Sequence, residues 1–114
     1  MAADDHCYLT TTGRVTGQPH EIEIWYERDG DAVYLLAGAG RASDWVCNLA
    51  ADPDATVRFG DDPQEHRFTG RLLEVDTDES ERARRLVFEK YQGRSGGDLS
   101  GWRVAALPVA LDPV

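Results

Sequence analysis

The segment from residue 21 to residue 38, EIEIWYERDGDAVYLLAG, constrains the fold more than any other part of the chain. Apolar residues occupy every second position from Ile22 to Tyr26, which is the period of a β-strand with one buried face. The sequence RDGD at residues 28–31 is typical of a hairpin turn, and AVYLLAG then returns as a second strand. The segment therefore predicts an antiparallel hairpin.

The rest of the chain continues this pattern of short strands. Strands are predicted at residues 8–12, 54–60, 66–75 and 102–113, with Gly70 indicating a bulge or bend and Pro108 an edge strand or a bulge. A short helix is predicted after Ser43 as its N-cap, and a longer one over residues 77–92 with a capping box formed by Asp76 and Glu79. About six mainly antiparallel strands with two helices predict a mostly β, barrel-like single domain over residues 1–114. The glycines at Gly38 and Gly40 lack the third glycine and the parallel βαβ context of a dinucleotide-binding fingerprint.

The charge and cysteine content exclude several classes of function. A net charge of −9 disfavours nucleic-acid binding, which needs clustered basic side chains. No stretch has the length and apolarity of a membrane span, and the first residues lack the pattern of a signal peptide. Two cysteines, Cys7 and Cys47, are too few for a disulfide framework, and the histidines form no metal-binding motif. We expect a cytoplasmic protein without a bound metal.

Two glycine-containing loops are candidates for anion binding. The first is TTTGRVTGQPH, where Arg14 lies between Gly13 and Gly17; exposed amides and a guanidinium can converge on a phosphate or carboxylate, although a plain hairpin loop explains the same residues. The second is GAGRASDW at residues 38–45, where Arg41 precedes the N-terminus of the short helix. Asp44 would compete with an anion there, and a capped structural helix is the alternative interpretation.

Residues suited to direct catalysis are few. Trp25 alternates with the polar side of its strand and is expected either to line a pocket or subunit interface or to be covered by a helix. Glu21 and Glu23 share one strand face, which suits a carboxylate pair but equally a solvated face or ion pairs with arginine. If the protein is an enzyme, a cofactor must supply the difficult chemistry.

These motifs in combination resemble a known family. The order L-T-T-T-G-R-x-T-G-Q-P, a strand–Asp-Gly-Asp–strand hairpin and G-x-G-x-x-S-D-W-x-x-N-L-x-x-D-P is similar to the deazaflavin-dependent nitroreductases. The specific part runs from Leu9 to about Phe59 and continues more loosely to Tyr91 and the final strand. The resemblance implies a split β-barrel of the FMN-binding type and a reductase using the 5-deazaflavin coenzyme F420, with a nitro, quinone-like or conjugated acceptor.

The resemblance also implies a cofactor site. The coenzyme tail would meet the first loop and its phosphate the second, while Trp25 and Tyr91 become candidates for the ring and substrate side. The implied cofactor-binding residues are Thr12, Gly13, Arg14, Thr16, Gln18, Gly38, Ala39, Gly40, Arg41, Ser43, Trp45 and Asn48.

The chain departs from the family pattern at the first loop. Many relatives carry a second basic residue where this chain has Val15, which weakens the expected hold on a polyanionic coenzyme. Split barrels often complete a pocket by dimerising, so we expect a homodimer. An FMN-binding protein, and a non-catalytic carrier of a flavin, deazaflavin or haem, remain the alternatives.

Overall fold

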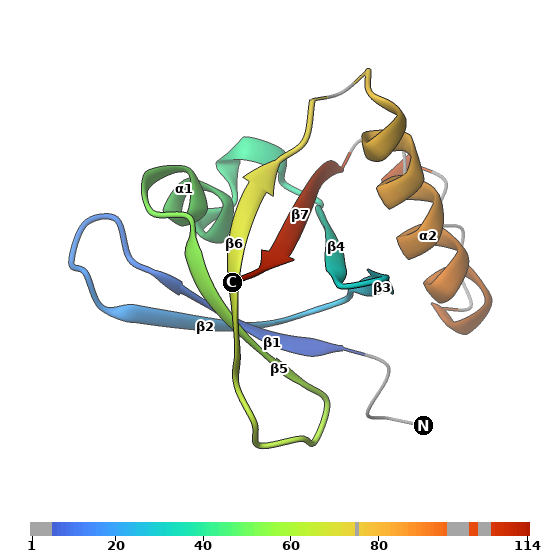
Figure 1. Cartoon of the computed structure of the whole chain (residues 1–114). Coiled ribbons are helices and arrows are strands. Elements are labelled where there is room, and N and C mark those ends of the chain that lie inside the picture. Colours follow the sequence, from blue (N-terminus) through green and yellow to red (C-terminus); the bar gives the residue numbers. More distant parts are fainter. Residues whose placement is uncertain (1–5, 75, 96–100, 103–105) are drawn as a thin grey trace.

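The backbone of the protein is one curled antiparallel sheet, described here from a computed structural model over residues 6–74, 76–95, 101–102 and 106–114 (Figure 1). Within these residues the sheet has seven strands in the order β2-β1-β5-β6-β7-β4-β3. The strands are β1 (Cys7–Thr12), β2 (Pro19–Ile24), β3 (Glu27–Asp29), β4 (Ala32–Ala37), β5 (Asp54–Phe59), β6 (His66–Leu72) and β7 (Leu107–Pro113). The helical elements are the 3₁₀ turn η2 (Gly40–Ala42), α1 (Asp44–Ala51) and α2 (Asp78–Ser95). The prediction of a mostly antiparallel, barrel-like sheet with two helices is confirmed.

The strand predicted over residues 21–27 is divided in two. β2 ends at Ile24 and β3 begins at Glu27, yet these two strands lie at opposite ends of the strand order. Only Trp25 and Tyr26 connect them, so the two edges of the sheet must come close together where the barrel is split. This division accounts for the seventh strand.

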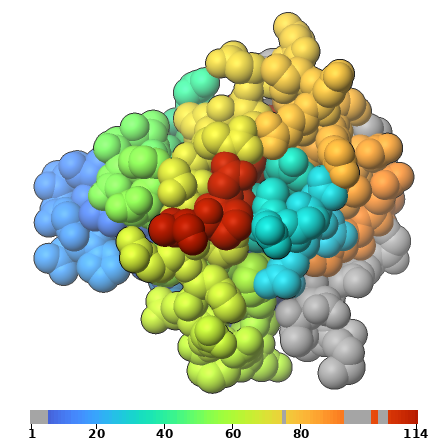
Figure 2. All heavy atoms as spheres, in the orientation of Figure 1, coloured from blue at the N-terminus to red at the C-terminus, as the bar shows by residue number. Residues whose placement is uncertain are grey.

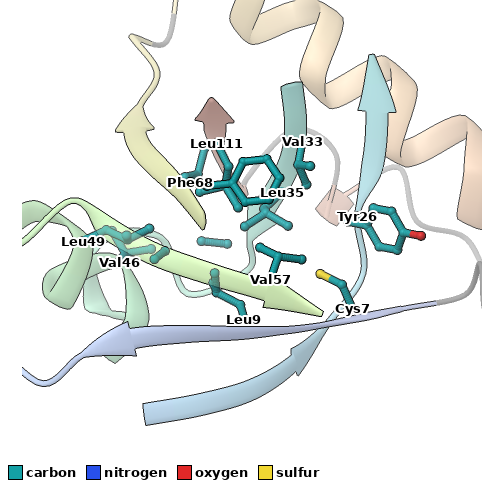
Figure 3. Close-up of a cluster of buried hydrophobic side chains, with 13 residues drawn as sticks. Cys7, Leu9, Tyr26, Val33, Leu35, Val46, Leu49, Val57, Phe68 and Leu111 are labelled. Atoms are coloured by element: carbon teal, nitrogen blue, oxygen red, sulfur yellow. The ribbon is translucent and has the colours of Figure 1, made fainter. Parts of the chain in front are cut away.

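The barrel interior is apolar and is closed at one end by α1. Leu9, Val57 and Leu111 are fully buried there, and Val46 and Leu49 of α1 point into the same cluster (Figure 3). Gly70 lets α1 approach, because a Cβ at this position would lie 3.0 Å from a methyl carbon of Leu49. Of the two predicted alternatives, a bulge or a bend, the bulge is wrong, because the register of β6 with β7 continues through Gly70 without an extra residue. Close packing of a helix gives a further reason for the glycine.

α2 covers the outer face of the sheet at β4 and β7. Its residues Ala83, Val87 and Tyr91 are buried against Tyr34 and Ala110. The helix begins one residue later than the predicted capping box requires: the Thr77 hydroxyl accepts a hydrogen bond from the Ser80 amide at 3.2 Å. Asp76 is therefore not the cap, and Glu79 is used in a different interaction.

β7 lies in the interior of the sheet, between β6 and β4 (Figure 2). The prediction of an edge strand from Pro108 is therefore wrong. The Pro108 carbonyl accepts a hydrogen bond from the Leu73 amide at 3.1 Å, so the side of Pro108 that lacks an N–H points past the end of β6 rather than toward β4. A central strand tolerates a proline here because only one ladder bond is lost, the one to the Leu73 carbonyl, and it falls just beyond the end of β6.

A charged cluster joins the sheet to α2. The Arg71 guanidinium donates to both carboxylate oxygens of Glu79, at 3.0 and 2.9 Å, and also to Asp112 of β7. Tyr34 donates to Glu79 as well, at 3.1 Å. The hydrogen bonds from Arg71 lower the pKa of Glu79, against the opposing effect of burial, and the Tyr34 hydroxyl and the charge of Arg71 add to the lowering.

We expect Glu79→Gln to reduce the free energy of unfolding at pH 7 by about 1 kcal/mol. The effect is small because solvent partly screens the ion pair between Arg71 and Glu79. A lowered folded-state pKa means that the charged carboxylate stabilises the protein above its unfolded-state pKa. This stabilisation is lost as the pH falls through the folded-state pKa, so wild type and variant should converge in acid. Urea denaturation across this pH range measures the difference. Glu89→Gln, an exposed change of the same charge on α2, is the control and should show no such convergence.

Candidate functional site

The first loop, residues 13–18 between β1 and β2, is a compact turn with fixed geometry. The Gly13 amide donates to the Gln18 carbonyl and the Gly17 amide to the Gly13 carbonyl, both at 2.8 Å. Gly17 has a φ of 75°, which glycine adopts without strain. A Cβ on Gly13 would lie 2.8 Å from the His20 ring and 3.1 Å from the Gln18 carbonyl oxygen, so a side chain here would displace the exposed His20 ring. Val15 stands at the loop tip with 88% of its surface exposed.

Arg14 turns back from this loop onto α1. Its backbone amide and its guanidinium donate to the Asn48 side-chain oxygen at 3.2 and 2.9 Å. The guanidinium also lies 3.4 Å from both the carbonyl and a carboxylate oxygen of Asp44. Its side chain is still 39% exposed and borders a hollow of about 210 Å³, so it remains accessible to a ligand.

Asn48 itself is buried, with 2% of its surface exposed. Besides accepting from Arg14, it donates to the Thr11 hydroxyl at 3.1 Å. Thr11 is also 2% exposed and faces the barrel interior. The structure thus places Asn48 behind Arg14.

The second loop, residues 38–43, presents backbone amides. Gly40 has a φ of 58°, and the loop closes through Ala42 and Ser43 amides that bond to the carbonyls of Ala39 and Gly40 at 3.1 Å. In the described part of the chain, the amides of Ala39, Gly40 and Arg41 donate to no protein group. Consecutive unpaired amides around a residue of positive φ form a concave anion-binding site.

The two loops meet at the first turn of α1. Ser43 is the N-cap residue, as predicted, but its side chain makes no capping hydrogen bond. Asp44 follows it and is the residue that Arg14 contacts. Figure 2 shows the atoms of the β1–β2 hairpin directly against those of α1. Arg14 thus contacts the first residue of α1, and Ser43 and the open amides precede the same helix in the chain, where the helix dipole also favours an anion.

Trp25 borders a separate apolar hollow of about 520 Å³, lined by Glu23, Ile24, Trp25, Leu36 and Trp102. The indole of Trp25 stacks on Tyr91 with ring centroids 4.4 Å apart, meets Trp102 edge-on at 5.7 Å and is 38% exposed. Both expectations for Trp25 thus hold in part, since α2 covers one face and the remaining surface lines a hollow. We call this the two-tryptophan hollow.

Tyr91 supports this hollow from behind. It is 2% exposed, and its hydroxyl accepts from the Tyr26 amide and donates to the Tyr26 carbonyl, each at 3.0 Å. Lys90 donates to the same carbonyl at 2.8 Å. These contacts fix the two-residue connection between β2 and β3.

The other implied cofactor-binding residues differ in accessibility. Thr16 and Gln18 are exposed in the first loop, and the Gln18 amide donates to the Thr16 hydroxyl at 3.2 Å. Thr12 is half-buried at the end of β1, and Trp45 is half-buried and packs against the barrel core. Gly38 lies beside Trp102, whose ring is 3.7 Å from a Cβ built on the glycine.

The side chains with possible catalytic roles are otherwise engaged. Burial raises the pKa of the Cys7 thiol to about 12, which keeps it protonated and unreactive. Glu21 pairs with Arg58 at 3.8 Å, in agreement with the ion-pair interpretation, and Glu23 lies 3.7 Å from His6.

No helix in the described residues has the length and apolarity needed to cross a membrane.

Several contributors were not identified from the sequence. Thr11, Leu36, Lys90 and Trp102 each support one of the two sites through tertiary contacts. For Thr11 a signal existed: after Leu9, alternation along β1 places it on the inner face, where an uncompensated hydroxyl requires a partner.

The chain is similar to characterised proteins in both sequence and structure. Residues 1–107 match the model of the F420H(2)-dependent quinone reductase family. An F420H(2)-dependent quinone reductase of Mycobacterium tuberculosis is 33% identical over 89 residues, which is 75% of this chain and 58% of that protein. The chain thus spans little more than half the length of this curated relative.

Solved structures confirm the fold. An F420H2-dependent reductase superposes with a TM-score of 0.65 at 22% identity, over 93% of this chain and 91% of that one. A Listeria innocua protein named after pyridoxamine 5′-phosphate oxidase gives a TM-score of 0.68 at 18% identity, over 96% and 83% of the two chains. The sheet is therefore a split β-barrel, and the chain belongs to the F420H(2)-dependent quinone reductase family.

Proposed function

We propose that this protein is an F420-dependent oxidoreductase that transfers a hydride between the reduced deazaflavin and a small quinone-like, nitro or other conjugated acceptor. The observation that carries the proposal is the run of unpaired amides from Ala39 to Arg41 beside the uncapped N-terminus of α1 and Arg14. Family membership supplies the identity of the anion. The activity is proposed and not taken from family membership alone, because the chain covers only 58% of its curated relative.

The residues present fit such a coenzyme. The amides of Ala39, Gly40 and Arg41 and the Ser43 hydroxyl would hold a phosphate, since donors that lack a protein partner gain most from a bound anion. Arg14 would bind the acidic tail through its exposed guanidinium, with Thr16 and Gln18 beside it.

The two-tryptophan hollow would take the flat rings. The deazaflavin supplies the hydride when bound, so the protein must bind and orient ring and acceptor rather than provide a nucleophile. Trp25 offers an indole held rigidly against Tyr91, and Leu36 adds an apolar wall. Glu23 at the same hollow disfavours an anionic acceptor there.

We also propose that the protein acts as a cytoplasmic homodimer. Among the described residues β2 pairs only with β1, and the partly exposed Trp25 follows its end, so a second copy has an open strand edge to contact. Cys7 and Cys47 are free thiols, in agreement with a reducing compartment. Light scattering of the purified protein tests the dimer.

The central test is a titration of the purified protein with F420, FMN and haem, followed by fluorescence and absorbance. We expect binding of F420, and oxidation of its reduced form when a quinone is added. Tight FMN binding without a response to F420 would replace the proposal with an FMN-binding protein. Binding of F420 without turnover on any quinone or nitro acceptor would indicate a carrier.

Asp44→Asn is expected to tighten F420 binding by about two- to fivefold, because an exposed ion pair is weak but its carboxylate competes for Arg14 and repels the coenzyme. The Asp44 carboxylate is 87% exposed and lies 3.4 Å from the guanidinium. Dissociation constants measured at low and high salt check this. Asp61→Asn in the β5–β6 loop removes the same charge elsewhere, and an equal gain in that variant would indicate a net-charge effect alone.

A further inference from the structure

The implied cofactor-binding set includes Asn48, but the structure assigns this side chain to other partners. Its oxygen accepts from the Arg14 amide and from the Arg14 guanidinium, and its nitrogen donates to Thr11. Two N–H donors point at the same atom, so that atom must be the amide oxygen and the orientation of the side chain is chemically determined. This inference rests on the proposed function.

Asn48 lies at the back of the hollow of about 210 Å³ that Arg14 also borders, and it is much more deeply buried than Arg14. Only 2% of its surface is exposed, whereas the Arg14 side chain in front of it is 39% exposed. The polar atoms of Asn48 are already bonded to Arg14 and Thr11, so Arg14 is the group in this hollow with free donors for a coenzyme anion.

The contacts with Asn48 restrict both ends of Arg14. The amide bond holds the backbone at the start of the first loop, and the bond from the guanidinium holds the far end of the same side chain. An arginine fixed at both ends loses little conformational entropy when an anion binds. Asp44 contacts the guanidinium at longer range through an exposed carboxylate, which an incoming anion can displace.

We infer that Asn48 is a positioning residue, anchored on Thr11, that acts on coenzyme binding only through Arg14. Thr11 and Asn48 are buried and hold Arg14 from behind. Arg14 is the residue of the three that would contact the ligand. Thr11 and Asn48 are buried polar residues next to the apolar cluster of the barrel, and positioning Arg14 explains why polar residues occur there.

A double-mutant cycle tests this inference with F420 as the probe. Asn48→Leu fills the space without polar atoms and should raise the dissociation constant about tenfold, with the coenzyme KM rising and kcat little changed. In an Arg14→Ala background the same change should have less than about a twofold effect. Equal effects of Asn48→Leu in both backgrounds would show that Asn48 contributes independently of Arg14, and would overturn the inference.

Hydrogen exchange in the coenzyme-free protein provides an independent measurement. Asn48→Leu should accelerate exchange of the Arg14 amide at least about tenfold while the Gly13 amide, bonded to Gln18, keeps its protection. Asn48→Asp should retain protection, because a carboxylate still accepts from Arg14 and the Thr11 hydroxyl can donate to it. Unchanged exchange at Arg14 in Asn48→Leu would refute the support role. A wild-type protein that fails to bind F420 would refute the proposed function instead, and the exchange measurement would still decide whether Asn48 holds Arg14.

Discussion

Replacing Arg14 with alanine should weaken binding of F420 by about one to two orders of magnitude, the loss of a charge-assisted hydrogen bond worth roughly 1.5–3 kcal/mol. Arg14 is the side chain of the first loop that α1 holds in place, and Val15 beside it offers no second charge. The contribution of the first loop to F420 affinity should therefore come mainly from Arg14 and not from a second basic residue. Fluorescence titration with F420 measures it, and the effect should shrink as salt increases.

Two controls separate the guanidinium from general electrostatics. Arg85→Ala on the exposed side of α2 removes the same charge and should leave the dissociation constant unchanged. Arg14→Lys keeps the charge but loses the planar fork, so it should recover only part of the affinity. If Arg14→Ala and Arg85→Ala had the same small effect, the first loop would be an ordinary hairpin connection.

Tyr91→Ala should lower the free energy of unfolding by about 3–5 kcal/mol, because it removes a fully packed aromatic ring from the core beneath α2. The same change removes the ring on which Trp25 stacks and the hydroxyl that holds the Tyr26 backbone. Chemical denaturation measures the loss, and Trp25 near this ring contributes a fluorescence signal.

Tyr91→Phe separates the ring from its hydroxyl. It keeps the stacking surface but leaves the Tyr26 amide without this acceptor, at a cost of about 1–3 kcal/mol. We expect stability to decrease in the order wild type, Tyr91→Phe, Tyr91→Ala, with weaker acceptor binding in the alanine variant. A phenylalanine variant as stable as wild type would mean that the hydroxyl does not secure the connection between β2 and β3.

Local signals predicted most of the strands and helices. Alternation, the Asp-Gly turn and the N-cap at Ser43 operate within a few residues, so they are visible in one sequence. The incorrect predictions concern residues whose role depends on a contact with a residue far away in the sequence. Gly70 is small because of Leu49, Pro108 is tolerated because β6 ends beside it, and Glu79 is taken by Arg71 instead of a capping box.

The candidate site shows the same division. Glycine-rich loops and Arg14 could be recognised from residue types, and family resemblance joined them into one coenzyme site, which stays a prediction. The sequence could not show that Asn48 lies behind Arg14, because exposure depends on how deeply α1 enters the barrel. Nor could it show that Trp25 and Trp102, separated by most of the chain, share one hollow.

The close packing of Leu49 against Gly70 has a consequence for how this protein can change during evolution. Leu49 occupies the space that a larger residue at position 70 would fill, and Leu49 is adjacent to Asn48 on α1. A larger residue at position 70 would press on Leu49, and any shift of α1 that followed would also move Asn48 and the Arg14 contact that it makes. If the proposed coenzyme site is correct, mutations deep inside the barrel can therefore change coenzyme affinity without any change in the residues proposed to contact the coenzyme.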